Sequence, residues 1–149
     1  MKTLLQRVTE ACVSAGGEEV GRIGTGLVVL VGVAGGDSEK DIQYLADKIL
    51  GLRIFPDEEG KFNLSVADVK GELLVISQFT LLADTRRGRR PSFSEAATPF
   101  EAEVLFARFI ERIKAGGLKT ETGRFQQHMQ VEIHNDGPVT IMLDSRDKS

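Results

Sequence analysis

The alternation of hydrophobic and polar residues along the chain predicts short strands that are joined by turns. Residues 2–13 are rich in Leu, Val and Thr, and residues 18–23 form a second strand-like run after the glycine pair at 16–17, which is typical of a β-hairpin. Residues 27–33 are continuously apolar, which indicates a strand covered on both faces and central in its sheet. Residues 72–78 form a further buried strand.

Two amphipathic helices are predicted from apolar residues that recur every three or four positions. The first apolar stripe covers residues 42–50 and ends before Gly51. The second covers residues 102–113 and follows Thr98 and Pro99, which are typical of an N-cap and of the first helical position. Both helices should therefore place one apolar face against the sheet.

Three further runs, residues 119–122, 129–134 and 139–143, bring the number of predicted strands to about seven. The plain interpretation of residues 135–138, Asn-Asp-Gly-Pro, is a hairpin loop with a trans proline. Strands and helices do not alternate regularly, so a doubly wound parallel sheet is disfavoured. We expect a single α+β domain over residues 1–149, with a mostly antiparallel or mixed, twisted, barrel-like sheet and two amphipathic helices.

Composition limits the class of protein. The chain has 149 residues, 41% of them hydrophobic and 28% charged, which is typical of a globular domain with a sizeable core. No apolar stretch approaches the ~20 residues that a membrane span requires. The N-terminus runs directly into a patterned segment, which disfavours a signal peptide, and the single cysteine, Cys12, excludes an intramolecular disulfide. We expect a cytoplasmic protein without membrane contact.

The charge distribution is uneven. The net charge of −3 argues against general binding of nucleic acid, but Arg86, Arg87, Arg89 and Arg90 surround Gly88 in a compact basic segment. Such a segment suits contact with a polyanion. A solvated surface loop is the alternative.

No familiar catalytic set is present in the sequence. His128 and His134 lack a neighbouring cysteine or second histidine at metal-ligand spacing, and no nucleophile, base and orienting group form a triad. Cys12 is interpreted as a packing residue. The glycines between residues 21 and 26 precede a strand rather than a helix, so they are interpreted as turn residues and not as a phosphate loop. We predict neither a metal site nor a cofactor.

Two segments carry the candidate chemistry. Ser77, Gln78, Phe79 and Thr80 end a buried strand, where backbone N–H groups beside hydroxyls can hold a carbonyl oxygen as negative charge develops on it. A threonine nucleophile would need an adjacent base, and none is visible. The second segment is residues 135–140. By themselves, the two segments are a strand end and a turn.

Taken in order, these and further segments resemble the D-aminoacyl-tRNA deacylase family over nearly the whole chain. The segments that carry the resemblance are Gln6-Arg7-Val8, residues 24–33, Arg53-Ile54-Phe55, residues 77–81, Ala83-Asp84-Thr85, Gly88, residues 90–93, residues 122–125, Met129-Gln130-Val131 and residues 135–140. Each is weak alone, and their order and spacing make the resemblance specific.

The resemblance implies a homodimer that hydrolyses the ester between a D-amino acid and the terminal adenosine of tRNA, and that also removes glycine wrongly attached to alanine tRNA. It implies a cis Gly137–Pro138 bond, which one subunit inserts into the site of the other as a chiral filter. Arg7 would brace this loop. Phe125 and Met129 match positions near the terminal adenine. Such a filter would be a wall of main-chain atoms, which cannot move by changing rotamer as a side chain can. It would admit glycine as a substrate, because glycine has no side chain.

By the same resemblance, residues 77–80 hold the aminoacyl group, and residues 86–90 lie where the acceptor stem of the tRNA approaches. We hypothesise that backbone N–H groups near Phe79 and Thr80 stabilise the oxyanion. The 2′-hydroxyl of the substrate, or a water that it positions, would assist the attack. Thr80 as a covalent nucleophile is the rival mechanism.

Two alternative functions remain at this point. The first is a non-catalytic RNA-binding module, which would account for the arginines but not for residues 77–80 and Gly137-Pro138 occurring together. The second is a related deacylase with a trans Gly-Pro bond that acts on small L-aminoacyl-tRNA. Arg7 and the residues around Gly137-Pro138 favour the cis form.

Overall fold

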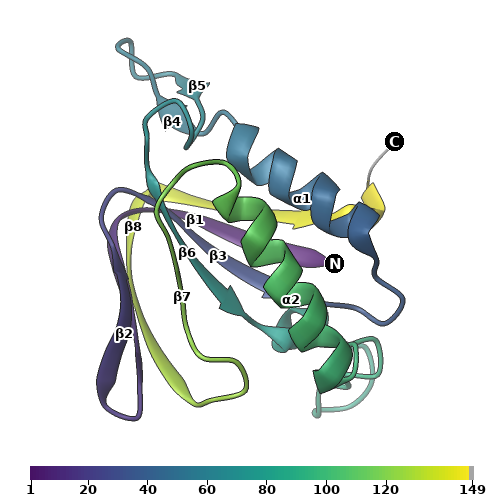
Figure 1. Ribbon diagram of the computed structural model, residues 1–149. Helices are drawn as coiled ribbons and strands as arrows, with labels where there is room; N and C mark the ends of the chain where they lie inside the picture. Colours follow the sequence, from purple (N-terminus) through teal and green to yellow (C-terminus); the bar gives the residue numbers. More distant parts are fainter. Residues whose placement is uncertain (148–149) are drawn as a thin grey trace.

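The computed structural model describes residues 1–147. It consists of a twisted, nearly closed mixed β-sheet with two α-helices against one face (Figure 1). The elements are β1 (Lys2–Ala15), β2 (Glu18–Ile23), β3 (Gly26–Gly32), α1 (Glu39–Gly51), β4 (Phe55–Pro56), β5 (Phe62–Leu64), β6 (Glu72–Ser77), the 3₁₀ helix η1 (Phe79–Leu82), α2 (Pro99–Lys114), β7 (Thr120–Thr122), β8 (Met129–Asp144) and the 3₁₀ helix η2 (Ser145–Asp147). The predicted α+β class with a barrel-like sheet is confirmed.

The main sheet has the strand order β2-β1-β3-β6-β7, and β8 pairs with β1. Pairing is parallel between β3 and β6 and between β6 and β7, and it is antiparallel elsewhere in this sheet. The first half of β1 pairs with β3, its second half pairs with β2, and β8 follows β1 along both halves. The sheet therefore bends around β1, and the apolar β3 lies centrally, as its sequence predicts.

The two helices follow their predicted signals. In α1, Asp41 accepts a hydrogen bond of 2.8 Å from the Ser38 backbone N–H, and in α2, Thr98 Oγ1 accepts one of 3.3 Å from the Glu101 N–H. These bonds satisfy N–H groups that a helix start leaves unpaired. Each helix buries its apolar stripe in one core with the sheet, through residues such as Ile42, Leu45, Phe109 and Ile113.

The prediction of two separate strands and a hairpin loop in the last part of the chain is wrong. β8 is continuous from Met129 to Asp144, and both of its halves pair with the same strand, β1. Residues 136–139 form a bulge opposite Arg7, between the pairs Val8–Asn135 and Gln6–Thr140. The turn-forming residues are accommodated because a bulge, like a turn, lets the chain leave the regular ladder.

A small second sheet, β4 with β5, projects from one end of the molecule and was not predicted (Figure 1). It is too short to show a period in its sequence. Within residues 1–147, no helix combines the length and the apolar character needed to cross a bilayer.

Candidate active site

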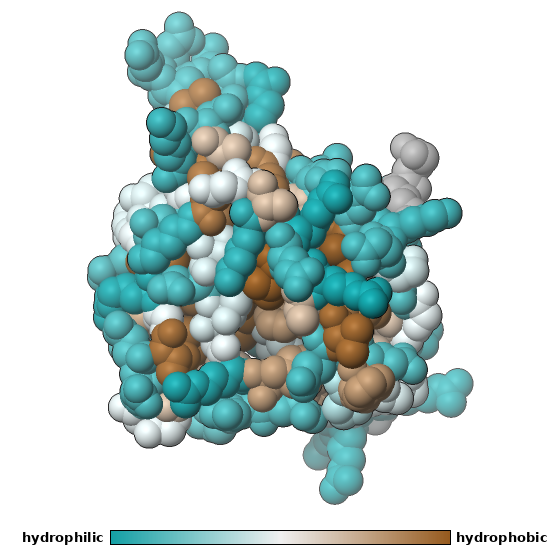
Figure 2. All heavy atoms as spheres, viewed as in Figure 1, coloured by the Kyte–Doolittle hydropathy of each residue, from teal (hydrophilic) through white to brown (hydrophobic). Residues whose placement is uncertain are grey.

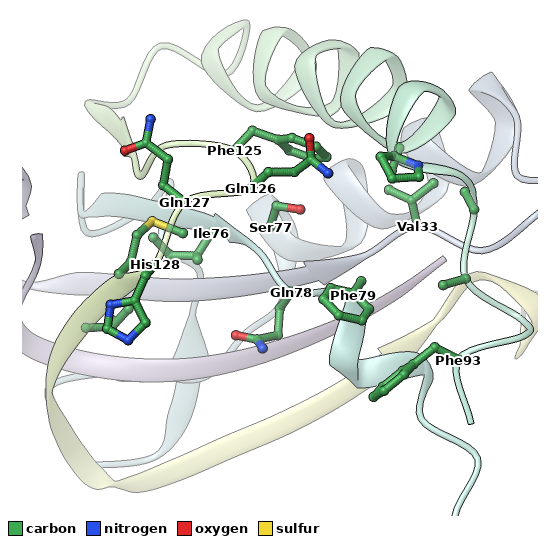
Figure 3. A pocket seen from close by; sticks show the side chains of 16 residues that line it. Val33, Ile76, Ser77, Gln78, Phe79, Phe93, Phe125, Gln126, Gln127 and His128 are labelled. Atoms are coloured by element: carbon green, nitrogen blue, oxygen red, sulfur yellow. The ribbon is translucent and has the colours of Figure 1, made fainter. Parts of the chain in front are cut away.

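A cavity of about 700 Å³ opens at the carboxyl end of β6 (Figure 3). Ser77, Gln78 and Phe79 line one side of it, and residues 125–129 line the other, just before and at the start of β8. Phe93 and the first turn of α2 complete the wall. No Asp, Glu, Lys or Arg is among the residues that line this cavity. Figure 2 shows hydrophobic side chains gathered in the middle of the same face, with hydrophilic ones around them.

The backbone at the end of β6 leaves two donors unpaired. The N–H of Gln78 still donates to Val31 O at 2.7 Å, and the N–H of Leu81 donates to Gln78 O at 3.2 Å. The N–H groups of Phe79 and Thr80, between these two, donate no hydrogen bond within residues 1–147. The cause is local, because the first N–H groups of a helix have no carbonyl before them to bond. Two adjacent free donors beside an uncharged cavity are suited to an oxygen that carries negative charge.

The Thr80 hydroxyl has no base beside it. Within the described chain its hydrogen-bond partner is the side-chain amide of Gln78, which cannot accept a proton at neutral pH. Thr80 is exposed and does not itself line the cavity. The arrangement therefore lacks the nucleophile–base pair that covalent catalysis by threonine requires.

The opposite wall is held by aromatic and sulfur contacts. The Phe125 ring lies 6.2 Å from the Phe106 ring of α2, and Met129 Sδ accepts a hydrogen bond of 3.3 Å from the Arg124 N–H. The fold thus brings Phe125 and Met129, which the sequence resemblance picked out, to the same cavity as Ser77. His128 also lines this wall, although the sequence favoured a surface or satisfied strand histidine.

Arg7 and Gly137-Pro138 form a second region. The buried Arg7 guanidinium donates from Nε to Asp136 O at 3.1 Å and from Nη1 to Ile54 O at 2.8 Å, and it pairs with the Asp136 carboxylate at 3.2 Å. The Asn135 amide donates to the carbonyls of Arg7 and Val139, both at 3.0 Å. These bonds fix the bulge from behind, while Gly137 and Pro138, joined by a cis peptide bond, are exposed in front.

The two regions do not meet within one chain. Gly137, Pro138 and Arg7 do not line the cavity, and Gly137 lies eight residues along β8 from Met129, roughly 26 Å at the rise of a strand. Instead, Arg7 is covered by the β4–β5 hairpin. The Phe62 ring lies 5.5 Å from the Arg7 guanidinium carbon, and the ring is 56% exposed.

The basic segment forms an exposed loop next to η1. Arg86 is held by Asp84 through bonds of 2.9 and 2.7 Å, and these bonds lower the pKa of the Asp84 carboxyl to about 2. Arg87, Arg89 and Arg90 are exposed and make no ion pair within residues 1–147. One of the four predicted phosphate-binding arginines is therefore neutralised by its own neighbour, and three remain uncompensated.

The remaining candidates lie on the β1–β8 ladder, away from the cavity. Cys12 is buried, and its thiol donates to Glu132 at 2.9 Å. This hydrogen bond to a carboxylate, together with burial, raises the thiol pKa to about 11. His134 faces Glu10 at 3.5 Å. Among residues 1–147, no cluster of His, Cys, Asp and Glu has the geometry of a metal site.

The sequence missed part of the cavity wall. Phe93, Gln126 and Gln127 contribute to it. A single phenylalanine in a loop gives no signal that separates a cavity wall from a core, and glutamines in a loop give none that separates a cavity wall from the solvated surface. Gln126 has a φ of 61°, which is unusual for a residue with a side chain. A positive φ is not visible in a sequence unless a glycine marks it.

The chain is similar to known proteins over nearly its whole length. Residues 4–144 match the family model described as D-Tyr-tRNA(Tyr) deacylase. A D-aminoacyl-tRNA deacylase of Dehalococcoides mccartyi is 60% identical over 148 residues, which cover 99% of this chain and 97% of that protein. One of Symbiobacterium thermophilum is 57% identical, covering 97% of this chain and 96% of its own.

Two solved structures share the fold. One is titled c-Myc DNA Unwinding Element Binding Protein and superposes with a TM-score of 0.91 at 42% identity, covering 97% of this chain and 98% of its own. The other is titled as a structural analysis of a probable eukaryotic D-amino acid tRNA deacylase. It superposes with a TM-score of 0.82 at 17% identity and covers 95% of this chain and 97% of its own.

Proposed function

Because this chain belongs to the D-Tyr-tRNA(Tyr) deacylase family, we propose that the cavity at the end of β6 is the place where it hydrolyses D-aminoacyl-tRNA. The enzyme is a hydrolase that acts on the ester bond of aminoacyl-tRNA. The observation that carries the choice of site is the pair of unpaired N–H groups of Phe79 and Thr80 beside a cavity without charged lining. Removal of one such donor typically lowers kcat by ~10²–10³.

In this mechanism the ester carbonyl oxygen accepts hydrogen bonds from the Phe79 and Thr80 N–H groups. A water attacks the carbonyl carbon, the bond to the ribose oxygen breaks, and that oxygen takes a proton as the amino acid leaves. The neighbouring 2′-hydroxyl of the substrate positions the water or relays the proton. The wall of the cavity offers no carboxylate or lysine for this step, and its histidine, His128, lies on the wall opposite Phe79. The terminal adenine lies against Phe125 and Met129.

Two experiments separate this mechanism from its rival. Thr80→Ala should retain near-normal turnover, because the N–H of residue 80 survives the substitution. A loss of turnover of 10³-fold or more would instead support Thr80 as the nucleophile. A substrate that ends in 2′-deoxyadenosine should react much more slowly, and a full rate with it would contradict the role of the 2′-hydroxyl.

The exposed Gly137-Pro138 segment is proposed as the chiral filter of a second subunit. Its main chain is braced by Arg7 and Asn135, and it lies too far along β8 to reach the cavity of its own chain. In a homodimer it could enter the cavity of the partner and stand close to the α-carbon of the substrate. Such a wall of backbone would exclude L side chains and admit D-amino acids and glycine, including glycine attached to alanine tRNA.

Mixed dimers test the shared site. One variant carries Phe79→Pro, which lacks a donor in the cavity, and the other carries Gly137→Ala, which alters the filter. If the filter acts across the interface, one site of each heterodimer combines an intact cavity with an intact filter, and the ratio of L to D hydrolysis falls below that of the Gly137→Ala homodimer. An unchanged ratio in the mixture would contradict a shared site, and sedimentation of the wild type as a monomer would contradict the dimer.

Arg86, Arg87, Arg89 and Arg90 are proposed to bind the tRNA. The protein is proposed to act in the cytoplasm. The alternatives are a non-catalytic RNA-binding module and a deacylase of small L-aminoacyl-tRNA. Hydrolysis assays with the D-, L- and glycyl-tRNA substrates distinguish the three. Absence of hydrolysis of every substrate would favour the binding module, and faster hydrolysis of L-alanyl- than of D-alanyl-tRNA would favour the second alternative.

A further inference from the structure

A second depression lies beside the cavity and takes no part in the ester hydrolysis described above. Its volume is about 510 Å³, and it is lined by Asp84, Arg86, Arg87 and Ser92. These residues belong to the two ends and the first part of the loop that follows η1. The depression is polar, in contrast to the cavity next to it.

The loop is closed at its base by backbone pairing. The Asp84 N–H donates to Ser92 O at 2.8 Å, and the Ser92 N–H donates to Asp84 O at 2.9 Å. Residues 85–91 therefore form an exposed hairpin-like loop on a fixed base, with Gly88 at a φ of 63°. This base fixes where the arginines of the loop begin relative to the cavity.

The charges in the depression do not cancel. Asp84 accepts three hydrogen bonds from Arg86, two from its side chain and one of 3.0 Å from its backbone N–H, so this carboxylate is neutralised and occupied. Arg87 then remains as a cation without a counter-ion among the described residues. A guanidinium with free donors in a depression is a binding site for a phosphate group, which it can meet with two parallel bonds.

Two consecutive residues join the depression to the cavity. Ser92 lines the depression and Phe93 lines the cavity, and their Cα atoms are ~3.8 Å apart, as in any trans peptide. The Phe93 ring also packs on the Phe79 ring at 5.0 Å, edge to face, beside the oxyanion donors (Figure 3). A ligand whose terminal nucleoside occupies the cavity would therefore place the next part of its backbone over the depression.

We propose that the depression binds a phosphodiester of the single-stranded 3′ end of the tRNA, with Arg87 as its principal contact. This inference rests on the proposed function, because it takes the cavity as the site of the terminal nucleoside. The loop thus contacts the unpaired 3′ end of the tRNA rather than the double-stranded acceptor stem. The exposed Phe79 ring offers a stacking surface to the base that precedes the terminal adenine.

The test measures binding of two RNA minihelices that carry no amino acid and differ only in their 3′ end, one with a four-nucleotide overhang and one blunt. For the overhang RNA at low salt, Arg87→Gln should weaken binding roughly fivefold and reduce the slope of log K against log salt by about 0.7. For the blunt RNA the same variant should behave as the wild type does. Arg87→Lys keeps the charge and should restore the slope.

Arg108→Gln is the matched control, because Arg108 is an exposed arginine in another depression, on α2 beside Glu39. It makes the same change in net charge and should leave both affinities unchanged. An equal loss with the blunt and the overhang RNA would place Arg87 on the duplex and overturn the inference. Wild-type affinity of Arg87→Gln for both RNAs would overturn it as well. Hydrolysis of D-aminoacyl-tRNA by the wild type is scored separately, so the proposed function stands or falls on its own result.

Discussion

The cavity at the end of β6 and the bulge at Gly137-Pro138 are built in opposite ways. The cavity is concave, and its useful groups are backbone donors that a helix start leaves unpaired. The bulge is exposed, and its backbone is held from behind by a buried arginine and an asparagine amide. One region has free backbone donors and the other has a rigid surface. The function proposed for each uses no strong acid or base, so it depends on where the main chain is held.

The largest effect is expected from removal of a main-chain donor in the cavity. Phe79→Pro deletes the N–H of residue 79, and proline is tolerated at the first position of a helix. Gln78 before it is outside the α region, at a φ of −143° and a ψ of 78°. We expect kcat for D-aminoacyl-tRNA to fall ~10²–10³-fold relative to Phe79→Ala, which loses the ring but keeps the donor. Equal rates for the two variants would mean that this N–H does not stabilise the transition state.

The next effect concerns the brace behind the bulge. Arg7→Ala removes the guanidinium that donates to two carbonyls, and it leaves the Ile54 carbonyl, in a buried residue, without its donor. We expect the free energy of unfolding to fall by about 1–3 kcal/mol in urea titrations. Hydrolysis of L- relative to D-aminoacyl-tRNA should rise about tenfold, which corresponds to ~1.4 kcal/mol.

Arg7→Lys is the control for this brace, because it keeps the positive charge but loses the fork that bonds two carbonyls at once. It should recover part of the stability and less of the selectivity. If Arg7→Ala destabilises the protein while the L-to-D ratio stays constant, the brace is structural only, and the contrast between the two regions loses its functional meaning.

A smaller effect is expected from the aromatic cover of Arg7. Phe62→Ala removes a ring 5.5 Å from the guanidinium, in an exposed position where a cation–π contact contributes about 0.5–1 kcal/mol. We expect a loss of stability of this size and an increase of about twofold in the L-to-D ratio. Phe62→Tyr keeps the ring and should match the wild type in both measurements. A normal ratio in Phe62→Ala would show that the β4–β5 hairpin does not support the filter.

The smallest effect at neutral pH concerns Cys12, on the ladder between the two regions. Its pKa in the folded protein is about 11, raised from 9.0, because the thiol donates to Glu132 and is buried. Folding therefore favours the protonated thiol. This contribution to stability is complete below pH 9 and is lost as the pH rises from 9 towards 11. Unfolding midpoints should fall over this interval in the wild type and less in Cys12→Ala, and identical pH profiles would contradict the assignment.

Much of the fold could be predicted from the sequence, because its signals are local. The stripes of α1 and α2, the cap at Thr98 and the apolar run of β3 each depend on residues within a few positions of one another. The β4–β5 sheet could not be predicted, since strands of two and three residues show no period. The continuity of β8 could not either, because local turn preference at residues 135–138 competes with a ladder to β1 that joins residues more than 110 positions apart.

The candidate site likewise has features that depend on local sequence and features that depend on the tertiary structure. The sequence by itself identified the two segments that we propose carry the chemistry, residues 77–80 and 135–140, because hydroxyl, glycine and proline types in that order resemble one family. The tertiary structure alone decided that Phe79 and Thr80 have free N–H groups, that Phe125 and Met129 face Ser77, and that Gly137 does not. The physical reason is that a residue type is a local property. An unpaired donor or a cavity wall is defined only when the hydrogen bonds and packing of the whole chain have formed.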